Sequence, residues 1–122
     1  MAIRGTVKRG SIVIMNLDPQ AGHEQAGTRP AIVLSDGLID PAVSSFALIV
    51  PVTNQTKGLA FEVPVPGGIR TTGKQPFLEG YVLTDQPKSL DLKIRNAKVV
   101  GELDITSDFF RTVITNVRSI LA

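Results

Sequence analysis

The sequence contains no cysteine and no tryptophan, and it has one histidine and one tyrosine among 122 residues. Without cysteine, neither a disulfide framework nor a thiolate metal site can form. One histidine excludes a pair of imidazoles that act as acid and base. The carboxylates show no zinc or calcium spacing, and no glycine-rich phosphate loop is present, so we expect neither a metal nor another cofactor.

Long apolar runs are also absent. No apolar segment follows the basic N-terminus, and no run is long enough to cross a bilayer, so we expect no membrane association. The lack of cysteine fits a cytoplasmic protein. The net charge of +2 and the sequence pI of about 9.2 permit an anionic partner without requiring one.

Short apolar runs rich in β-branched residues are present, separated by Gly, Asp and Pro. They predict six strands, over Gly10–Leu17, Arg29–Ser35, Ser45–Thr53, Ala60–Pro66, Phe77–Asp85 and Asn96–Leu103. Because proline lacks the ladder N–H, the prolines of the fourth run place it at a sheet edge. The segment 87–93 is predicted to be a turn or a single helical turn.

The hydrophobic period changes after Thr106, which is the expected N-cap of a terminal helix. The apolar residues that then recur every three or four positions are Phe109, Phe110, Val113, Ile114, Val117, Ile120 and Leu121. This spacing predicts an amphipathic helix. Short strands without helices between them favour one mostly β domain over residues 1–122, an antiparallel barrel or rolled sheet with a C-terminal helix.

A polar cluster, "HEQAGTR", stands directly before the second predicted strand. If the second and third strands pair antiparallel, Arg29 lies opposite Thr53 at the open end of the sheet. Arginine suits phosphate oxygens, the threonine hydroxyl is a neutral donor, and Glu24 can accept a proton. These groups meet the needs of RNA cleavage by the adjacent 2′-hydroxyl. The alternative is a surface ion pair of Arg29 with Glu24, with Thr53 an ordinary strand residue.

Three blocks, "VKRGSIVIMNLDPQAGHEQAGTRPAIVLS", "ALIVPVTNQTKGLAFEVPV" and "GYVLTDQPKSLDLKIRNAKVVGEL", resemble the MazF/PemK family of toxin endoribonucleases in order and spacing. The resemblance implies a small SH3-like antiparallel barrel of the CcdB/PemK type and a homodimer. It also implies metal-independent, sequence-specific cleavage of single-stranded RNA, which leaves a 2′,3′-cyclic phosphate and a 5′-hydroxyl. On this chain the implied catalytic residues are Arg29, Thr53 and Glu24.

Residues around these three are the expected RNA contacts. They are His23, Gln25, Asn54, Gln86 and Lys88. Pro87 and Leu92 depart from the family pattern, and the segment 67–76 has no clear counterpart in it.

The resemblance further implies an antitoxin partner whose disordered C-terminal segment covers the RNA groove. Basic residues in or beside the site segments should attract such an acidic chain. They are Lys8, Arg9, Arg29, Lys57 and Lys88.

Two further expectations concern the assembly and the class of toxin. The segments "AIVL" and "FALIV" carry apolar side chains for both faces of a sheet, which predicts a surplus at a subunit interface. Because CcdB poisons gyrase on the same architecture, a non-enzymatic toxin that binds a protein target is the alternative function. A third hypothesis is an inactive relative that only binds an antitoxin.

Overall fold

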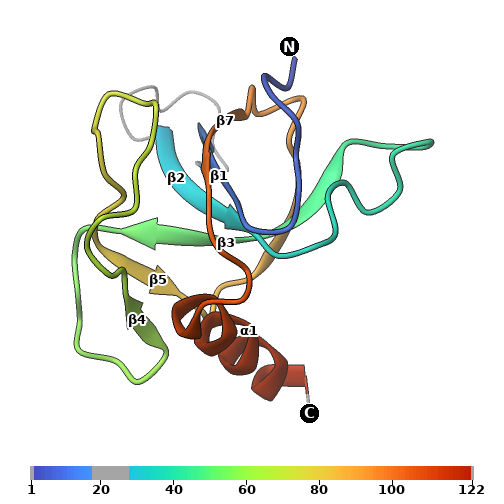
Figure 1. Cartoon of the computed structure of the whole chain (residues 1–122). Coiled ribbons are helices and arrows are strands. Elements are labelled where there is room, and N and C mark those ends of the chain that lie inside the picture. The colour runs from blue at the N-terminus through green and yellow to red at the C-terminus, as the bar shows by residue number, and fades with distance from the viewer. Residues whose placement is uncertain (1, 18–27, 122) are drawn as a thin grey trace.

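The computed structural model describes residues 2–17 and 28–121, which form seven strands and one C-terminal helix (Figure 1). The strands are β1 (Ser11–Asn16), β2 (Thr28–Val33), β3 (Phe46–Thr53), β4 (Glu62–Pro64), β5 (Tyr81–Leu83), β6 (Lys88–Asp91) and β7 (Lys98–Glu102), and the helix is α1 (Asp108–Leu121). The predicted class, mostly β with a C-terminal helix, is confirmed.

The strands form one rolled antiparallel sheet in the order β4-β5-β3-β2-β1-β7, and β6 pairs with β3 off this path. In the described part of the chain no ladder joins the end strands β4 and β7, so the predicted barrel is open rather than closed. β4 lies at a sheet end, as its prolines predict.

The segment 67–76, for which the sequence offered no role, spans the gap between the two ends. It continues the β4–β5 hairpin, because the Val65 N–H donates to the Gly80 carbonyl over 2.8 Å and the Leu78 N–H to the Ile69 carbonyl over 2.8 Å. Near the tip of this hairpin the Thr72 N–H donates to the Val100 carbonyl of β7 over 2.7 Å. The extended hairpin thus joins one end of the sheet to the other.

The pairing of β2 with β3 has the predicted register. Ala31 lies opposite Pro51, Ile32 opposite Val50 and Val33 opposite Ile49. This is the register that places Arg29 level with Thr53 at the open end, because each lies two residues beyond the Ala31–Pro51 pair.

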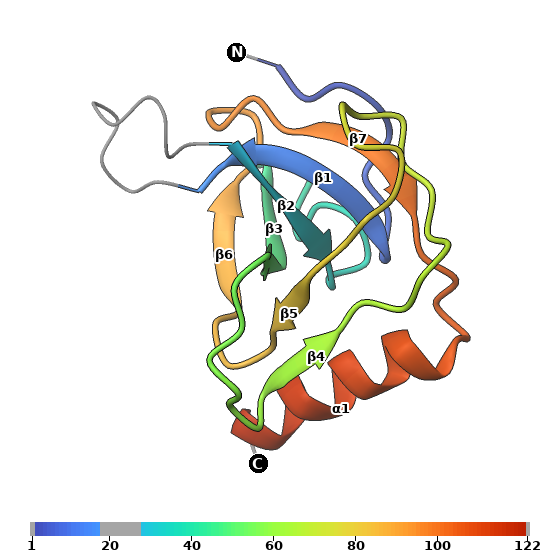
Figure 2. The ribbon, with the colours of Figure 1, turned by 90° about the vertical axis from the view of Figure 1, so that its left-hand side faces the viewer.

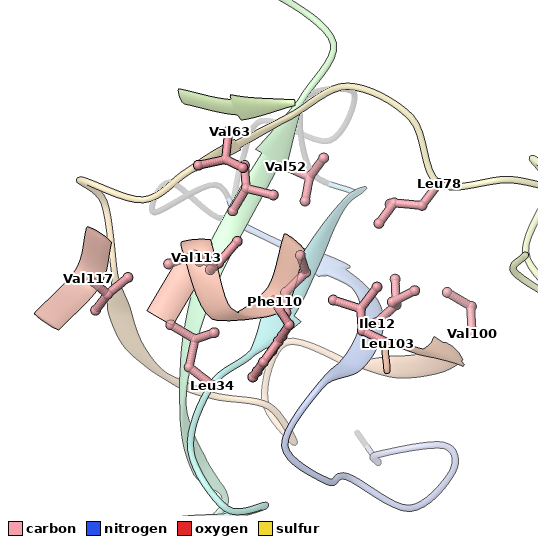
Figure 3. Packing of buried hydrophobic residues seen from close by; sticks show 13 residues of the cluster. Ile12, Leu34, Val52, Val63, Leu78, Val100, Leu103, Phe110, Val113 and Val117 are labelled. Carbon is pink, nitrogen blue, oxygen red and sulfur yellow. The ribbon is translucent and has the colours of Figure 1, made fainter. Parts of the chain in front are cut away.

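Alternate residues of β1, β2 and β3 enter two different cores. The first core, between the sheet and α1, contains Ile12 and Val50, and Figure 3 shows Phe110 and Val113 pointing from α1 into it. The second core, on the other face, contains Val13 and Ile49. The N-terminal segment, the β2–β3 loop and the β6–β7 region cover it, through residues that include Ile3, Val7, Leu38, Leu90, Leu92 and Ala97.

This arrangement corrects the reasoning that apolar residues on both strand faces imply a subunit interface. All of "AIVL", Ala31–Leu34, is buried within a single chain, each face in its own core. The apolar surplus of this segment is therefore used by the chain itself, whereas in "FALIV" the side chain of Phe46 stays exposed.

Two local predictions were wrong. The segment 87–93, predicted to be a turn or a single helical turn, contains strand β6, because its residues pair with β3, with Lys88 opposite Ile49. At the start of α1 the cap is Ser107, whose hydroxyl accepts the Phe110 N–H over 3.2 Å. Thr106 is instead bound to the Asp104 carboxylate over 2.6 Å.

The helix otherwise follows the predicted pattern. Its buried residues are Phe110, Val113 and Val117, and Phe109 and Ile114 pack partly against the first core. Within residues 2–17 and 28–121, no helix has the length and apolar character needed to cross a membrane.

Candidate functional site

Four strand termini meet at one end of the rolled sheet. β1 ends at Asn16, which lies opposite Thr28 at the start of β2, and β3 ends at Thr53, which lies opposite Tyr81 at the start of β5. Figure 2 shows this sheet with α1 along the side of β4, away from the N-terminal segment. The residues of this strand end are rigidly placed, because each belongs to a hydrogen-bonded strand.

Arg29 and Thr53 lie on adjacent strands at this end and on the same face of the sheet. Arg29 lies opposite Met15, a member of the second core, and Thr53 follows Ile49 of that core at an even spacing along β3. Side chains at even spacing along a strand share a face. The structure thus brings the two predicted residues to one place.

The surroundings of Arg29 leave its charge available. Its side chain is exposed, and it forms no hydrogen bond or ion pair with any residue in 2–17 or 28–121. An unpaired guanidinium keeps its planar set of donors for an anionic ligand.

Thr53 is half-buried, and its hydroxyl oxygen accepts the Gln55 N–H over 3.2 Å. This bond uses the oxygen as an acceptor and leaves the hydroxyl proton to donate to another group. Thr53 thus supplies an oriented neutral donor close to the guanidinium.

Gly80 allows β5 to approach the end of β3. Its φ is +115°, and a Cβ at this position would lie 2.2 Å from the Thr53 carbonyl oxygen. Any side chain would therefore force the two strands apart. The position of Thr53 depends on this glycine.

Tyr81 was not singled out from the sequence, yet the structure places it directly opposite Thr53. Opposed residues of an antiparallel pair share a face, with Cβ atoms about 4.5–5.5 Å apart. Tyr81 is half-buried, and its hydroxyl forms no hydrogen bond with a described side chain or backbone group. Its signal in the sequence was slight: the only tyrosine, directly after a glycine, at the start of a strand.

Arg95 is a second cation that the sequence did not reveal. Its Nη1 donates to the Asn16 carbonyl over 2.8 Å, which links the β6–β7 turn to the last residue of β1. The turn itself is shaped by Asn96, whose φ is +53°. Only the folded turn brings this arginine to the strand end, because 79 positions of sequence separate the two residues.

The other described candidates lie further along the same region. Asn54 is exposed and directly follows Thr53. Gln86 is exposed in the turn after β5, where its N–H donates to the Leu83 carbonyl over 3.1 Å. Lys88 lies opposite Ile49, four residues from Thr53 along β3, so about 13 Å away at the usual rise of a strand.

The expected basic groove is only partly formed. Arg9 donates to the Leu34 carbonyl over 2.9 Å, and Lys8 lies 3.9 Å from the Glu102 carboxylate. Both lie where β1 begins and β2 ends, the opposite end of these strands from Arg29, because the Gly10 N–H pairs with the Val33 carbonyl. Proximity in the sequence to β1 misled the prediction, since an antiparallel hairpin separates its two ends.

The predicted acid or base Glu24, and the RNA contacts His23 and Gln25, lie outside the described residues. Within the described ranges no three His, Cys, Asp or Glu residues are grouped so that they could hold a metal ion.

Comparison with known proteins gives a consistent picture. The model of a family described as PemK-like, MazF-like toxins of type II toxin–antitoxin systems matches residues 8–121. Endoribonuclease PemK of Escherichia coli is 38% identical over 99 residues, which cover 78% of this chain and 68% of that protein. Endoribonuclease toxin MazF of Escherichia coli strain K12 is 37% identical over 101 residues, 83% of each chain.

Solved structures agree with the sequence comparisons. A crystal structure of MazF from Deinococcus radiodurans has a TM-score of 0.77 and 34% identity, with 96% of this chain and 97% of that chain covered. A MazE–MazF crystal structure from the same organism also has a TM-score of 0.77, at 35% identity and 96% coverage of both chains.

Proposed function

This chain belongs to the PemK-like, MazF-like toxins of type II toxin–antitoxin systems, and we propose that it is an endoribonuclease which cleaves single-stranded RNA without a metal. The 2′-hydroxyl of one nucleotide attacks the adjacent phosphorus and the bond to the 5′-oxygen breaks. The products are a 2′,3′-cyclic phosphate and a 5′-hydroxyl. The endoribonuclease relatives PemK and MazF support this assignment.

One observation carries the proposal: Arg29, which has no ion pair with a described residue, and the Thr53 hydroxyl stand on neighbouring strands, on one face, at one end of the sheet. In the transition state, negative charge grows on the non-bridging phosphate oxygens. Arg29 stabilises this charge by direct donation, and the free Thr53 proton donates to the same phosphate. Because both residues are fixed by strands, no reorganisation is needed when the charge develops.

The attack also needs a group that accepts the 2′-hydroxyl proton and a group that protonates the leaving oxygen. We assign Glu24 to this acid and base chemistry. The RNA contacts of the proposal are His23, Gln25, Asn54, Gln86 and Lys88, together with Tyr81. The surface that runs from Thr53 along β3 to Lys88 then guides the RNA strand away from the scissile phosphate.

The chain acts in the cytoplasm as a homodimer, and an antitoxin neutralises it. The MazE–MazF complexes of Deinococcus radiodurans support an antitoxin partner. The disordered C-terminal segment of such an antitoxin competes with RNA for the site, so a non-cleavable RNA should displace a peptide from that segment. Simultaneous binding of RNA and peptide would place the inhibitor elsewhere.

Sedimentation at micromolar concentration measures the dimer, and a monomeric mass would contradict it.

The central experiment incubates the purified chain with a long RNA, with and without EDTA. We expect discrete fragments in both reactions, whose 5′ ends accept phosphate from a polynucleotide kinase without prior dephosphorylation. An intact RNA together with inhibition of gyrase would favour a toxin that binds a protein target. An intact RNA without toxicity in cells would indicate an inactive relative.

A further inference from the structure

The loop that follows Thr53 has almost no apolar anchor of its own. Residues 54–61 are all exposed, including Leu59 at 56% and Phe61 at 37%. An exposed eight-residue loop without packed side chains needs hydrogen bonds to hold one conformation. In the middle of the loop the structure supplies several of these bonds from the side chain of Glu62, the first residue of β4.

The Glu62 carboxylate gathers the middle of this loop. Its Oε1 accepts the Thr56 hydroxyl over 2.5 Å and the Lys57 N–H over 3.1 Å, and its Oε2 accepts the same N–H over 3.0 Å. The Thr56 hydroxyl in turn accepts the Gly58 N–H over 3.0 Å. The Thr56 hydroxyl and then the Lys57 N–H hold the pKa of Glu62 below its ordinary value, because both bonds favour the charged form.

Both ends of the loop are tied to the sheet that holds the site. Glu62 lies opposite Leu83 of β5, and β5 places Tyr81 opposite Thr53. At the other end the Gln55 N–H donates to the Thr53 hydroxyl oxygen. The loop therefore has a fixed position relative to Thr53, and the bonds of Glu62 help to determine this position.

We propose that Glu62 is a positioning residue for RNA binding, because it fixes the backbone of Lys57 in the loop that follows Thr53. The Lys57 side chain is exposed and forms no ion pair within the described ranges, while its backbone N–H is held by the carboxylate. Lys57 thus presents its ammonium group to an RNA phosphate from a fixed base. The inference rests on the proposed endoribonuclease function and adds a residue to it that does not touch the reacting atoms.

The test measures kcat and KM on an RNA oligonucleotide with one cleavage site. Glu62→Ala should raise KM about tenfold, the loss expected when a charged hydrogen bond is removed, with kcat changed less than about twofold. Glu62→Gln keeps an acceptor for the Thr56 hydroxyl or the Lys57 N–H and should restore most of the affinity. Removal of a negative charge near RNA would by itself lower KM, so a rise cannot come from charge alone.

Asp104→Ala is the matched control, because Asp104 also accepts a backbone N–H and a hydroxyl from one threonine, Thr106, at 2.9 and 2.6 Å. This carboxylate lies before α1, away from Thr53, and KM should not change. In a double-mutant cycle, Lys57→Ala should raise KM in the parent but have little further effect in Glu62→Ala.

Amide NMR of the chain without RNA tests the positioning role of Glu62 separately from the proposed endoribonuclease function. In the parent, the Lys57 amide resonance should follow the titration of Glu62, and in Glu62→Ala it should not. If it does so and KM stays unchanged in Glu62→Ala, or if the Lys57→Ala and Glu62→Ala effects add fully, the positioning role is wrong while the function stands. If the parent cleaves no RNA, the proposed function fails irrespective of Glu62.

Discussion

A Cβ atom on Gly80 would stand 2.2 Å from the carbonyl oxygen of Thr53. No real pair of such atoms approaches so closely, and the φ of +115° adds backbone strain for any other residue. Gly80→Ala should therefore lower the free energy of unfolding by about 2–3 kcal/mol and reduce cleavage by moving Thr53. Denaturant unfolding and single-turnover cleavage measure the two effects.

Gly67→Ala is the control for this substitution, because nothing lies within 4 Å of its Cβ position. Its stability should match that of the parent or slightly exceed it. If Gly80→Ala behaves like Gly67→Ala in both assays, the close contact with Thr53 is not part of the native structure.

Arg29→Ala should abolish cleavage without unfolding the protein. The side chain is exposed and has no partner among the described residues, so its loss should leave the melting temperature within a few degrees of the parent. The loss of charge stabilisation should lower kcat about 10²–10³-fold. Arg29→Lys keeps the charge but not the planar fork and should recover only part of the rate. Near-normal kcat in Arg29→Ala would remove the proposed site.

Thr53→Val preserves the shape of the side chain and removes its hydroxyl. We expect the single-turnover rate to fall about 10–100-fold, since the phosphate loses a donor and the Gln55 N–H loses its acceptor. Thr53→Ser retains the hydroxyl and should stay within a few-fold of the parent. A rate in Thr53→Val equal to that of the parent would reduce Thr53 to a strand residue.

Tyr81 offers an aromatic ring next to Thr53 on which a base of the RNA can stack. Tyr81→Ala should weaken binding of a non-cleavable RNA by about 1–3 kcal/mol, the usual range for one stacked base. Tyr81→Phe, which keeps the ring, should bind like the parent. Equal losses in both variants would show that the hydroxyl, and not the ring, contacts the RNA.

Two carboxylates, Glu62 and Asp104, have a lowered pKa because each accepts hydrogen bonds from a threonine hydroxyl and a backbone N–H. A carboxylate whose pKa is lower in the folded state stabilises the fold when the pH is above the ordinary pKa of the group. This ordinary pKa is 4.5 for Glu62 and 3.8 for Asp104. This stabilisation is lost as the pH falls below these values through the lowered pKa. Melting temperatures between neutral and acidic pH should therefore fall less steeply in Glu62→Gln than in the parent, and an unchanged slope would contradict the bonds to Thr56 and Lys57.

The sequence predicts well what depends on local pattern. The β2–β3 register follows from antiparallel pairing of two apolar runs that one loop connects, and the helix follows from its apolar spacing. Strand β6 could not be predicted in this way, because Lys88–Asp91 is polar and short and becomes a strand only by pairing with β3. The same holds for Arg95, whose bond to Asn16 exists only after the chain has folded.

The errors at the site have a similar cause. Lys8 and Arg9 precede the strand that leads to the site, but an antiparallel hairpin sends its two ends in opposite directions. The two-sided apolar pattern of β2 was correctly recognised, yet the pattern alone does not say whether another subunit or the same chain covers the second face. Here Leu38, in the loop after β2, and Leu92, distant in sequence, do so.

The outer edge of β7 bears on how this chain avoids aggregation. The N-terminal segment covers part of this edge, because the Arg4 N–H donates to the Ala97 carbonyl over 2.9 Å and the Val99 N–H donates to the Arg4 carbonyl over 2.8 Å. Further along the edge, the Thr72 N–H donates to the Val100 carbonyl. At the other end of the sheet, Pro64 gives β4 no N–H to offer a new strand. A newly made copy that meets another thus finds neither end of the sheet ready for edge-to-edge pairing, the step that begins amyloid-like growth.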